Sequence, residues 1–240
     1  KTVTVLPRPG NLRWWKPWTC VWFAANGFVN AVGLTNKGLD WWIRQPYRMA
    51  HRMGYKLAAS VWPMSAEDSE IFVTKLNPLS LRYVELNLSC PNTTDHLAAA
   101  QELLSPFARL GHPLVLKVSH AQAMDPAFLK MLHSVEAVHA INTIPWAVIF
   151  GEKPSPVRKG TGVDGGVSGP PIKSYALEAV RHIKQILPTM PVIGGGGIEN
   201  VEDVDEFRLA GADAFSIASC FLKKPWHPRS IISAYRAANS

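Results

Sequence analysis

Short apolar segments alternate with helical patterns along most of this 240-residue chain. Six segments have the length and composition of strands: Tyr55–Trp62, Leu81–Leu88, Pro113–Val118, Ala137–Asn142, Pro191–Gly195 and Asp213–Ala218. Helices are expected between and after them: one beginning near Ser65, then His96–Leu110, Pro126–Ser134, Lys173–Ile186, Val201–Ala210 and a final helix. Thr2–Leu6 is a candidate for a further strand. This alternation predicts an α/β fold with a parallel sheet and helices outside it.

Two architectures fit this alternation, a doubly wound sheet and a closed barrel. No G-x-G-x-x-G motif opens a helix after an early strand, which weakens the dinucleotide-binding interpretation. In a barrel, polar residues at the carboxyl ends of the strands meet at one mouth. The expected strand ends carry such residues: Asn87, Cys90, Lys117, Asn142, Thr143, Gly195 to Gly197, Ala218 and Ser219. We therefore predict a (β/α)8 TIM barrel in which residues 1–240 form a single domain.

The number of strands falls short of the eight that a barrel needs. We expect the barrel to be incomplete at its N-terminus, with about one and a half strands missing before residue 1. Hydrophobic residues make up 47% of the chain and charged residues 18%, which is enough apolar material for a sizeable core.

Composition also limits where the protein works and what it binds. No apolar run has the length of a membrane helix, and three distant cysteines do not make a disulfide framework, so we expect a cytoplasmic protein without membrane contact. The net charge of +7 is spread along the chain, which argues against a nucleic-acid partner. A basic protein can equally bind anionic small molecules.

Residues 85–93, ELNLSCPNT, end a strand with an amide, a thiol and a second amide. A lone cysteine is more often a buried small hydrophobe than a catalyst. The setting of Cys90, in a loop between Asn87 and Asn92, favours a nucleophile or general base beside amides that hold a planar polar ligand.

Lysine and glycine residues indicate an anionic cofactor. Lys117 interrupts the apolar strand PLVLKV, where it can compensate a negative charge at the barrel mouth. GGVSG (165–169) and GGGGI (194–198) let backbone N–H groups approach a phosphate. The histidines and cysteines lack metal-binding spacing, and no Gly-x-Ser-x-Gly elbow occurs, so we expect neither a metal site nor a serine hydrolase.

Several motifs in one order resemble the dihydroorotate dehydrogenases, and most closely the soluble class that uses a cysteine base. These motifs are KTVT (1–4), FVNAVGLTNKGLD (28–40), ELNLSCPNT (85–93), INT (141–143), GGVSGPPIK (165–173) and PVIGGGGI (191–198). The resemblance implies an FMN-containing barrel, an oxidoreductase of pyrimidine biosynthesis that converts dihydroorotate to orotate.

The resemblance also assigns roles to residues. Catalytic roles fall on Cys90, as the base, and Lys117. Substrate-binding roles fall on Lys1, Asn30, Val32, Gly33, Leu34, Asn87, Asn92, Asn142 and Thr143. FMN-binding roles fall on Asn87, Lys117, Gly169, Gly195, Gly196, Ala218 and Ser219.

Two other functions fit part of the pattern. One is a pyrimidine-reducing flavin barrel like that of dihydropyrimidine dehydrogenase, which shares the NLSCP core; the other is a non-catalytic fragment or flavin-binding module. CPNTT (90–94) and KTVT favour dihydroorotate dehydrogenase. The resemblance implies a homodimer and leaves the electron acceptor open between fumarate and NAD, the latter reached through an iron–sulfur flavoprotein subunit. GGVSGPPIK favours the NAD-linked type.

Overall fold

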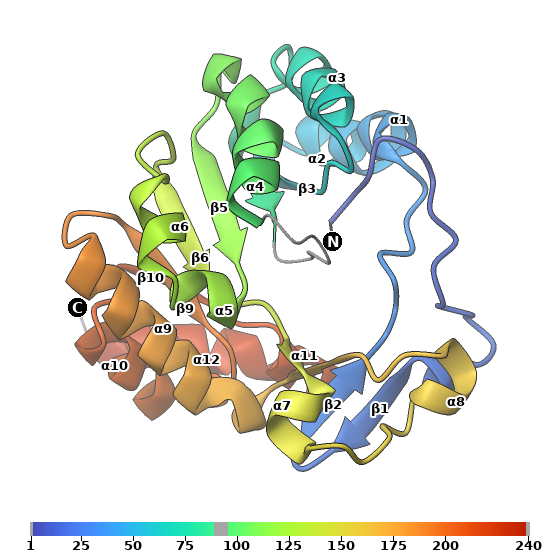
Figure 1. The fold of residues 1–240 in the computed structure, drawn as a ribbon, viewed down its shortest axis with the longest axis vertical. Helices are drawn as coiled ribbons and strands as arrows, with labels where there is room; N and C mark the ends of the chain where they lie inside the picture. Colours follow the sequence, from blue (N-terminus) through green and yellow to red (C-terminus); the bar gives the residue numbers. More distant parts are fainter. Residues whose placement is uncertain (1, 89–95, 239–240) are drawn as a thin grey trace.

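A six-stranded, wholly parallel sheet forms the centre of the computed structural model, which describes residues 2–88 and 96–238. The strand order is β10-β9-β6-β5-β4-β3. The strands are β3 (Leu57–Val61), β4 (Leu81–Asn87), β5 (Leu114–Val118), β6 (Ala137–Ala140), β9 (Val192–Gly195) and β10 (Ala214–Ser216). Figure 1 shows this sheet curling, with most helices on its outside. The arrangement is that of a (β/α)8 barrel that is open on one side.

Most of the helices lie on the outer side of this sheet (Figure 1). The α-helices are α1 (Leu39–Trp42), α2 (Arg48–Arg52), α3 (Ala66–Leu76), α4 (His96–Leu104), α5 (His120–Ala123), α6 (Pro126–Lys130), α7 (Trp146–Phe150), α8 (Arg158–Thr161), α9 (Lys173–Ile186), α10 (Val201–Leu209), α11 (Ser219–Lys223) and α12 (His227–Ala238). A π-helical turn, Ile43–Tyr47, joins α1 to α2. Short 3₁₀ turns lie at Pro17–Thr19, Ser105–Arg109 and Pro170–Ile172.

The six expected strands are confirmed in number and order, each somewhat shorter than expected. Ser65 caps α3 as expected, because its side chain accepts a hydrogen bond from the Asp68 N–H. The helix expected over 96–110 ends at Leu104, and a 3₁₀ turn containing Pro106 follows. A proline lacks the N–H that would continue the α-helix, so it begins a new turn instead.

The segment expected as a strand at Thr2–Leu6 pairs with the sheet only at Val3. Val3 forms a parallel bridge with Val61, through hydrogen bonds to Ser60 and Trp62. The chain then turns away: the Val5 carbonyl accepts from Leu39. A seventh strand is therefore reduced to one residue pair at the edge of β3.

Alternation of side chains divides the sheet into an apolar outer face and a polar inner face. Fully buried apolar side chains such as Leu86, Leu116 and Val138 face the helices. Lys117, opposite Asn87 on one neighbouring strand and His139 on the other, faces the interior. The outer face builds the core, and the inner face is left for polar groups.

A second, antiparallel sheet lies beside the barrel, at the bottom of Figure 1. Its order is β1-β2-β8-β7, formed by Val21–Ala24, Gly27–Asn30, Gly166–Ser168 and Ile144–Pro145. The β1–β2 hairpin turns through Ala25 and Asn26, which both have positive φ, as a two-residue hairpin requires. This sheet brings Asn30 and the Gly165–Gly169 segment together.

In the described part of the chain, no helix combines the length and hydrophobicity that crossing a bilayer demands.

Gly194 on β9 gives a test of the packing between sheet and helices. A Cβ added there would lie 2.7 Å from Phe207 Cδ1 and 2.9 Å from Ala212 Cβ. Gly194→Ala should therefore lower the free energy of unfolding by about 1–3 kcal/mol through overpacking. Urea unfolding monitored by circular dichroism measures this.

Gly111→Ala is the matched control, since its Cβ would meet only Asn77 Oδ1, at 3.6 Å. It should change stability by less than about 0.5 kcal/mol. Equal stability of the two variants would contradict the packing described for β9.

Candidate active site

A cavity of about 790 Å³ opens at the carboxyl ends of β5, β6, β9 and β10. Eight residues predicted from the sequence line it: Lys117, Asn142, Thr143, Gly169, Gly195, Gly196, Ala218 and Ser219. They come from four strand ends and from the loop after β8. Residues from the carboxyl ends of these four strands therefore meet at one cavity, as expected for a barrel mouth.

Close backbone contacts between glycines form one wall of the cavity. A Cβ on Gly195 would lie 2.8 Å from the Ser216 carbonyl, and one on Gly197 would lie 3.0 Å from the Gly169 carbonyl. Gly169 and Gly197 also have positive φ, at 89° and 87°. The ends of β9 and β10, and the loops after β8 and β9, therefore approach one another through backbone, with no larger side chain between them. Glycine backbone of this kind can bring N–H groups close to an anionic ligand.

A partly buried ion pair holds this glycine wall in place. Lys173 Nζ, at the start of α9, lies 2.8 Å from Asp203 Oδ1. The other Asp203 oxygen accepts the backbone N–H groups of Glu199 and Asn200, which follow the glycines. The hydrogen bonds to Asp203 and Glu206 raise the pKa of Lys173, so the ammonium remains charged. The loop after β9 is thus tied to the helix after β8.

Lys117 supplies a positive charge opposite the glycine wall. It lies on the inner face of β5, level with Asn87 on β4 and His139 on β6. Among the described residues, Lys117 has no carboxylate within ion-pair distance. Its charge also acts on Glu85, and an ammonium beside backbone donors can attract an anion.

A chain of hydrogen bonds crosses the barrel interior behind the cavity. Asn87 Nδ2 donates to Thr2 Oγ1 at 3.3 Å, and Thr2 and Ser60 share a hydrogen bond of 2.9 Å. Ser60 donates to Glu85 Oε1 at 2.8 Å, and His139 Nδ1 lies 2.6 Å from Glu85 Oε2. Each donor has an acceptor, as a buried polar network requires.

Glu85 is ionised within this chain. Burial on its own raises the pKa of the Glu85 carboxyl. The hydrogen bond from His139, the charge of Lys117 and the hydrogen bond from Ser60 outweigh burial and lower the pKa to about 2. Glu85 and His139 were not predicted as site residues. The sequence could have indicated them, because each is a polar residue within a strand that is otherwise mostly apolar, LRYVELNL or AVHAIN.

The residues of the cavity fit a cofactor that carries both a phosphate and a flat ring. The glycine wall offers backbone donors, Lys117 offers a charge, and Ile172, Ile198 and Leu222 offer apolar surface. A phosphate suits the backbone donors of the glycine wall. A flat ring with one polar edge suits the apolar side chains, and its polar edge suits Lys117.

Other predicted residues lie outside this cavity or outside the described residues. Asn30 donates to the Gly166 carbonyl at 3.4 Å, in the antiparallel sheet that contacts Thr143. Val32, Gly33 and Leu34 form a loop in which Gly33 and Leu34 have positive φ. They are not among the described residues that line the cavity. Lys1, Cys90 and Asn92 fall outside the described residues.

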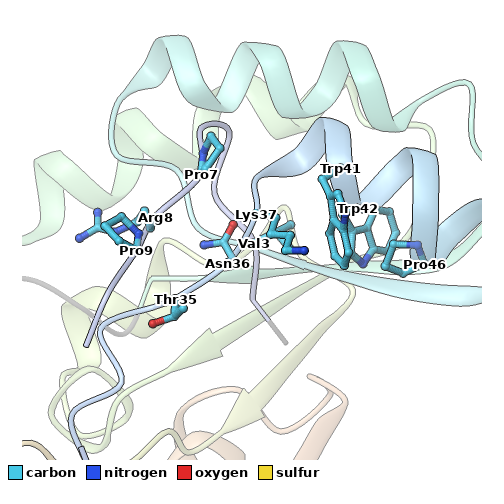
Figure 2. Close-up of a pocket in the computed structure, with 10 residues that line it drawn as sticks. All are labelled: Val3, Pro7, Arg8, Pro9, Thr35, Asn36, Lys37, Trp41, Trp42 and Pro46. Carbon is cyan, nitrogen blue, oxygen red and sulfur yellow. The ribbon is translucent and has the colours of Figure 1, made fainter. Parts of the chain in front are cut away.

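A second cavity, of about 830 Å³, lies between the N-terminal segment and the region of α1 (Figure 2). It is lined by Val3, Pro7, Arg8, Pro9, Thr35, Asn36, Lys37, Trp41, Trp42 and Pro46. None of its described lining residues was predicted as a site residue. Its prolines and tryptophans make a mostly apolar surface, so we place the chemistry in the first cavity.

Comparisons with a family model and with individual proteins point to the same family. The family model of dihydroorotate dehydrogenase matches residues 1–236. The catalytic subunit of dihydroorotate dehydrogenase B (NAD(+)) from Geotalea daltonii is 28% identical over 100% of this chain and 80% of its own length. Dihydroorotate dehydrogenase A (fumarate) from Limosilactobacillus reuteri is 30% identical over 94% of this chain and 75% of its own.

A solved structure has a similar fold. It is the dihydroorotate dehydrogenase of Eimeria tenella in complex with ferulenol, with a TM-score of 0.70 and 19% identity. The match covers 97% of this chain and 72% of that one. The likeness extends the barrel assignment to almost the whole chain.

The ionised state of Glu85 predicts how stability depends on pH. Because the pKa falls from 4.5 to about 2 on folding, Glu85 stabilises the fold above pH 4.5 and loses this effect as the pH drops towards 2. The wild type should therefore lose up to about 3 kcal/mol more stability than Glu85→Gln over that range. Urea unfolding from pH 7 to pH 2 measures the difference.

Glu102→Gln removes an exposed carboxylate on α4 and is the matched control. Its pH profile should follow that of the wild type. If Glu85→Gln also follows the wild type, Glu85 is not held ionised by the network.

Proposed function

Because this chain belongs to the dihydroorotate dehydrogenase family, we propose that it is the flavin-dependent oxidoreductase that converts dihydroorotate to orotate in pyrimidine biosynthesis. The observation that carries the proposal is the family match over residues 1–236. The cavity supports it, because eight residues assigned from sequence motifs line one opening.

FMN is the proposed cofactor. When bound, it accepts the hydride that leaves C6 of dihydroorotate. We assign its phosphate to the backbone of Gly169, Gly195 and Gly196 and to Ala218 and Ser219. The support is the glycine wall, where Gly195 and Gly197 lie so close to neighbouring backbone that no larger side chain fits.

Lys117 is proposed to stabilise negative charge at the pyrimidine edge of the flavin. Its support is its position on the inner face of β5, with Asn87 and His139 level with it on either side. A fixed cation acts most strongly where charge develops during the reaction. Asn87 would contact both cofactor and substrate from the neighbouring strand.

Amide side chains are proposed to hold the substrate. Asn142 and Thr143 line the cavity, and Asn87 lies on β4, level with Lys117 of β5. Carboxamides donate and accept hydrogen bonds at once, which matches the alternating N–H and C=O edge of a dihydropyrimidine. The remaining substrate assignments are Lys1, Asn30, Asn92 and the stretch Val32, Gly33 and Leu34.

Cys90 is proposed as the base. Its deprotonated Sγ removes the proton from C5 of dihydroorotate while the hydride leaves C6, and the C5–C6 double bond of orotate forms. The two hydrogens leave different carbons, so the thiol belongs on the face of the substrate opposite the flavin. Solvent then takes the proton from Sγ.

The electron acceptor and the assembly are further proposals. Two similar relatives are named catalytic subunits of an NAD(+)-linked enzyme, which supports a partner subunit for this chain. We propose that this partner carries an iron–sulfur centre and flavin, that the catalytic chain forms a homodimer, and that the assembly is cytoplasmic.

Anaerobic titration tests the proposed reaction. The purified protein should be yellow and release FMN when denatured. Its flavin absorbance should bleach with dihydroorotate and not with dihydrouracil, which lacks the carboxylate. Bleaching by dihydrouracil alone would indicate the dihydropyrimidine-type reaction, and a colourless protein that does not take up added FMN would contradict flavin chemistry.

Cys90→Ser tests the base. Serine is a far weaker acid than a thiol, so flavin reduction by dihydroorotate at pH 7 should slow by about 10²–10⁴-fold. Substrate affinity should change much less, because the amide contacts remain. Stopped-flow reduction across pH measures both.

Cys220→Ser is the matched control, since Cys220 is buried at the start of α11. It should reduce its flavin at a rate close to that of the wild type. An unchanged rate and pH profile in Cys90→Ser would mean that the base lies elsewhere.

A further inference from the structure

His139 is a buried histidine in the wall of the proposed flavin cavity, and only one of its ring nitrogens is occupied. It is 7% exposed and lines the cavity together with Lys117 and Gly195. Its Nδ1 lies 2.6 Å from Glu85 Oε2. Nε2 makes no hydrogen bond within the described ranges, where Ser155 Oγ is the one side-chain polar atom both unpartnered and sealed from solvent. Nε2 is therefore left to contact a molecule in the cavity.

Glu85 fixes the orientation and tautomer of this ring. Its carboxylate is itself held by the Ser60 hydroxyl, and Ser60 is held by Thr2. A carboxylate can only accept a hydrogen bond, so Nδ1 carries the hydrogen and donates it to Glu85. In the neutral ring, Nε2 then has a free lone pair and is a hydrogen-bond acceptor.

His139 stands between the places proposed for the flavin ring and for its phosphate. The strand order β5-β6-β9 puts it between Lys117, proposed at the pyrimidine edge, and Gly195, proposed at the phosphate. Adjacent strands lie about 4.8 Å apart, so a ligand that contacts both β5 and β9 crosses β6 over about 10 Å. In FMN the ribityl chain joins the ring to the phosphate, and it carries a row of hydroxyl groups. Ile141 and Ile172, which also line the cavity, offer these hydroxyls no side-chain acceptor.

We propose that Nε2 of His139 accepts a hydrogen bond from a ribityl hydroxyl of FMN, and that Glu85 holds the ring in the tautomer and orientation for this contact. In this role His139 binds the linker of the cofactor, whereas Lys117 acts on the ring and the glycine wall on the phosphate. The inference rests on the proposed function, because it requires FMN in this cavity.

The test compares dissociation constants of FMN and of FMN analogues that each lack one ribityl hydroxyl, the 2′-deoxy, 3′-deoxy and 4′-deoxy forms. The flavin-free full chain is titrated with each at pH 8, where an imidazole is neutral, and quenching of flavin fluorescence is followed. The wild type should bind one of the analogues about 3–10-fold more weakly than FMN, as expected for one neutral hydrogen bond. His139→Asn keeps an amide donor for Glu85 near the place of Nδ1 but removes Nε2. It should bind FMN about 3–10-fold more weakly than the wild type does, and should bind that same analogue as tightly as it binds FMN.

His133→Asn, at an exposed position after α6, is the matched control and should keep the wild-type preference for FMN over the analogue. Thermal melting of each variant verifies that it is folded. A wild type that binds all the analogues as tightly as FMN overturns this inference without recourse to any variant. So does a folded His139→Asn that discriminates between FMN and the analogues as the wild type does, and both results leave the proposed function intact. A wild type that binds no FMN overturns both.

Discussion

The register of the parallel strands is the constraint on which both fold and site depend. Side chains alternate between two faces, so a slip of β5 by one residue would turn Lys117 towards the helices. Leu116 and Val118, fully buried on the outer face, oppose such a slip because they would enter a polar interior. The apolar core therefore fixes the height at which Asn87, Lys117 and His139 meet.

The polar side chains inside the barrel are explained by the needs of the site, because stability alone does not require them. Replacing a buried ion pair with apolar residues of similar volume is often neutral or stabilising, whereas removing one partner is costly. The chain from Asn87 through Thr2 and Ser60 to Glu85 and His139 satisfies these groups one after another. A barrel that only needed to fold could fill this space with valine and leucine. Here the space holds polar and charged side chains, and some of them line the cavity.

The strands and the glycine loops could be predicted because their signals are local: an apolar run, a turn, a repeated glycine. The pairing of Glu85 with His139 could not, because 54 residues and the intervening strand β5 separate them. Only the strand order shows that their side chains converge. The β1–β2 hairpin was missed because Trp22 and Phe23 are both exposed and give no alternation, although Asn26-Gly27 is a turn signal.

The glycine wall also determines how late in its synthesis the chain can first bind a flavin. Lys117 belongs to β5, but Gly195 rests against Ser216 and Gly169 against Ser219, which are synthesised much later. A nascent chain that stops before Ser219 has the cation without the wall. A flavin that needs this wall can therefore be bound only after synthesis has passed Ser219.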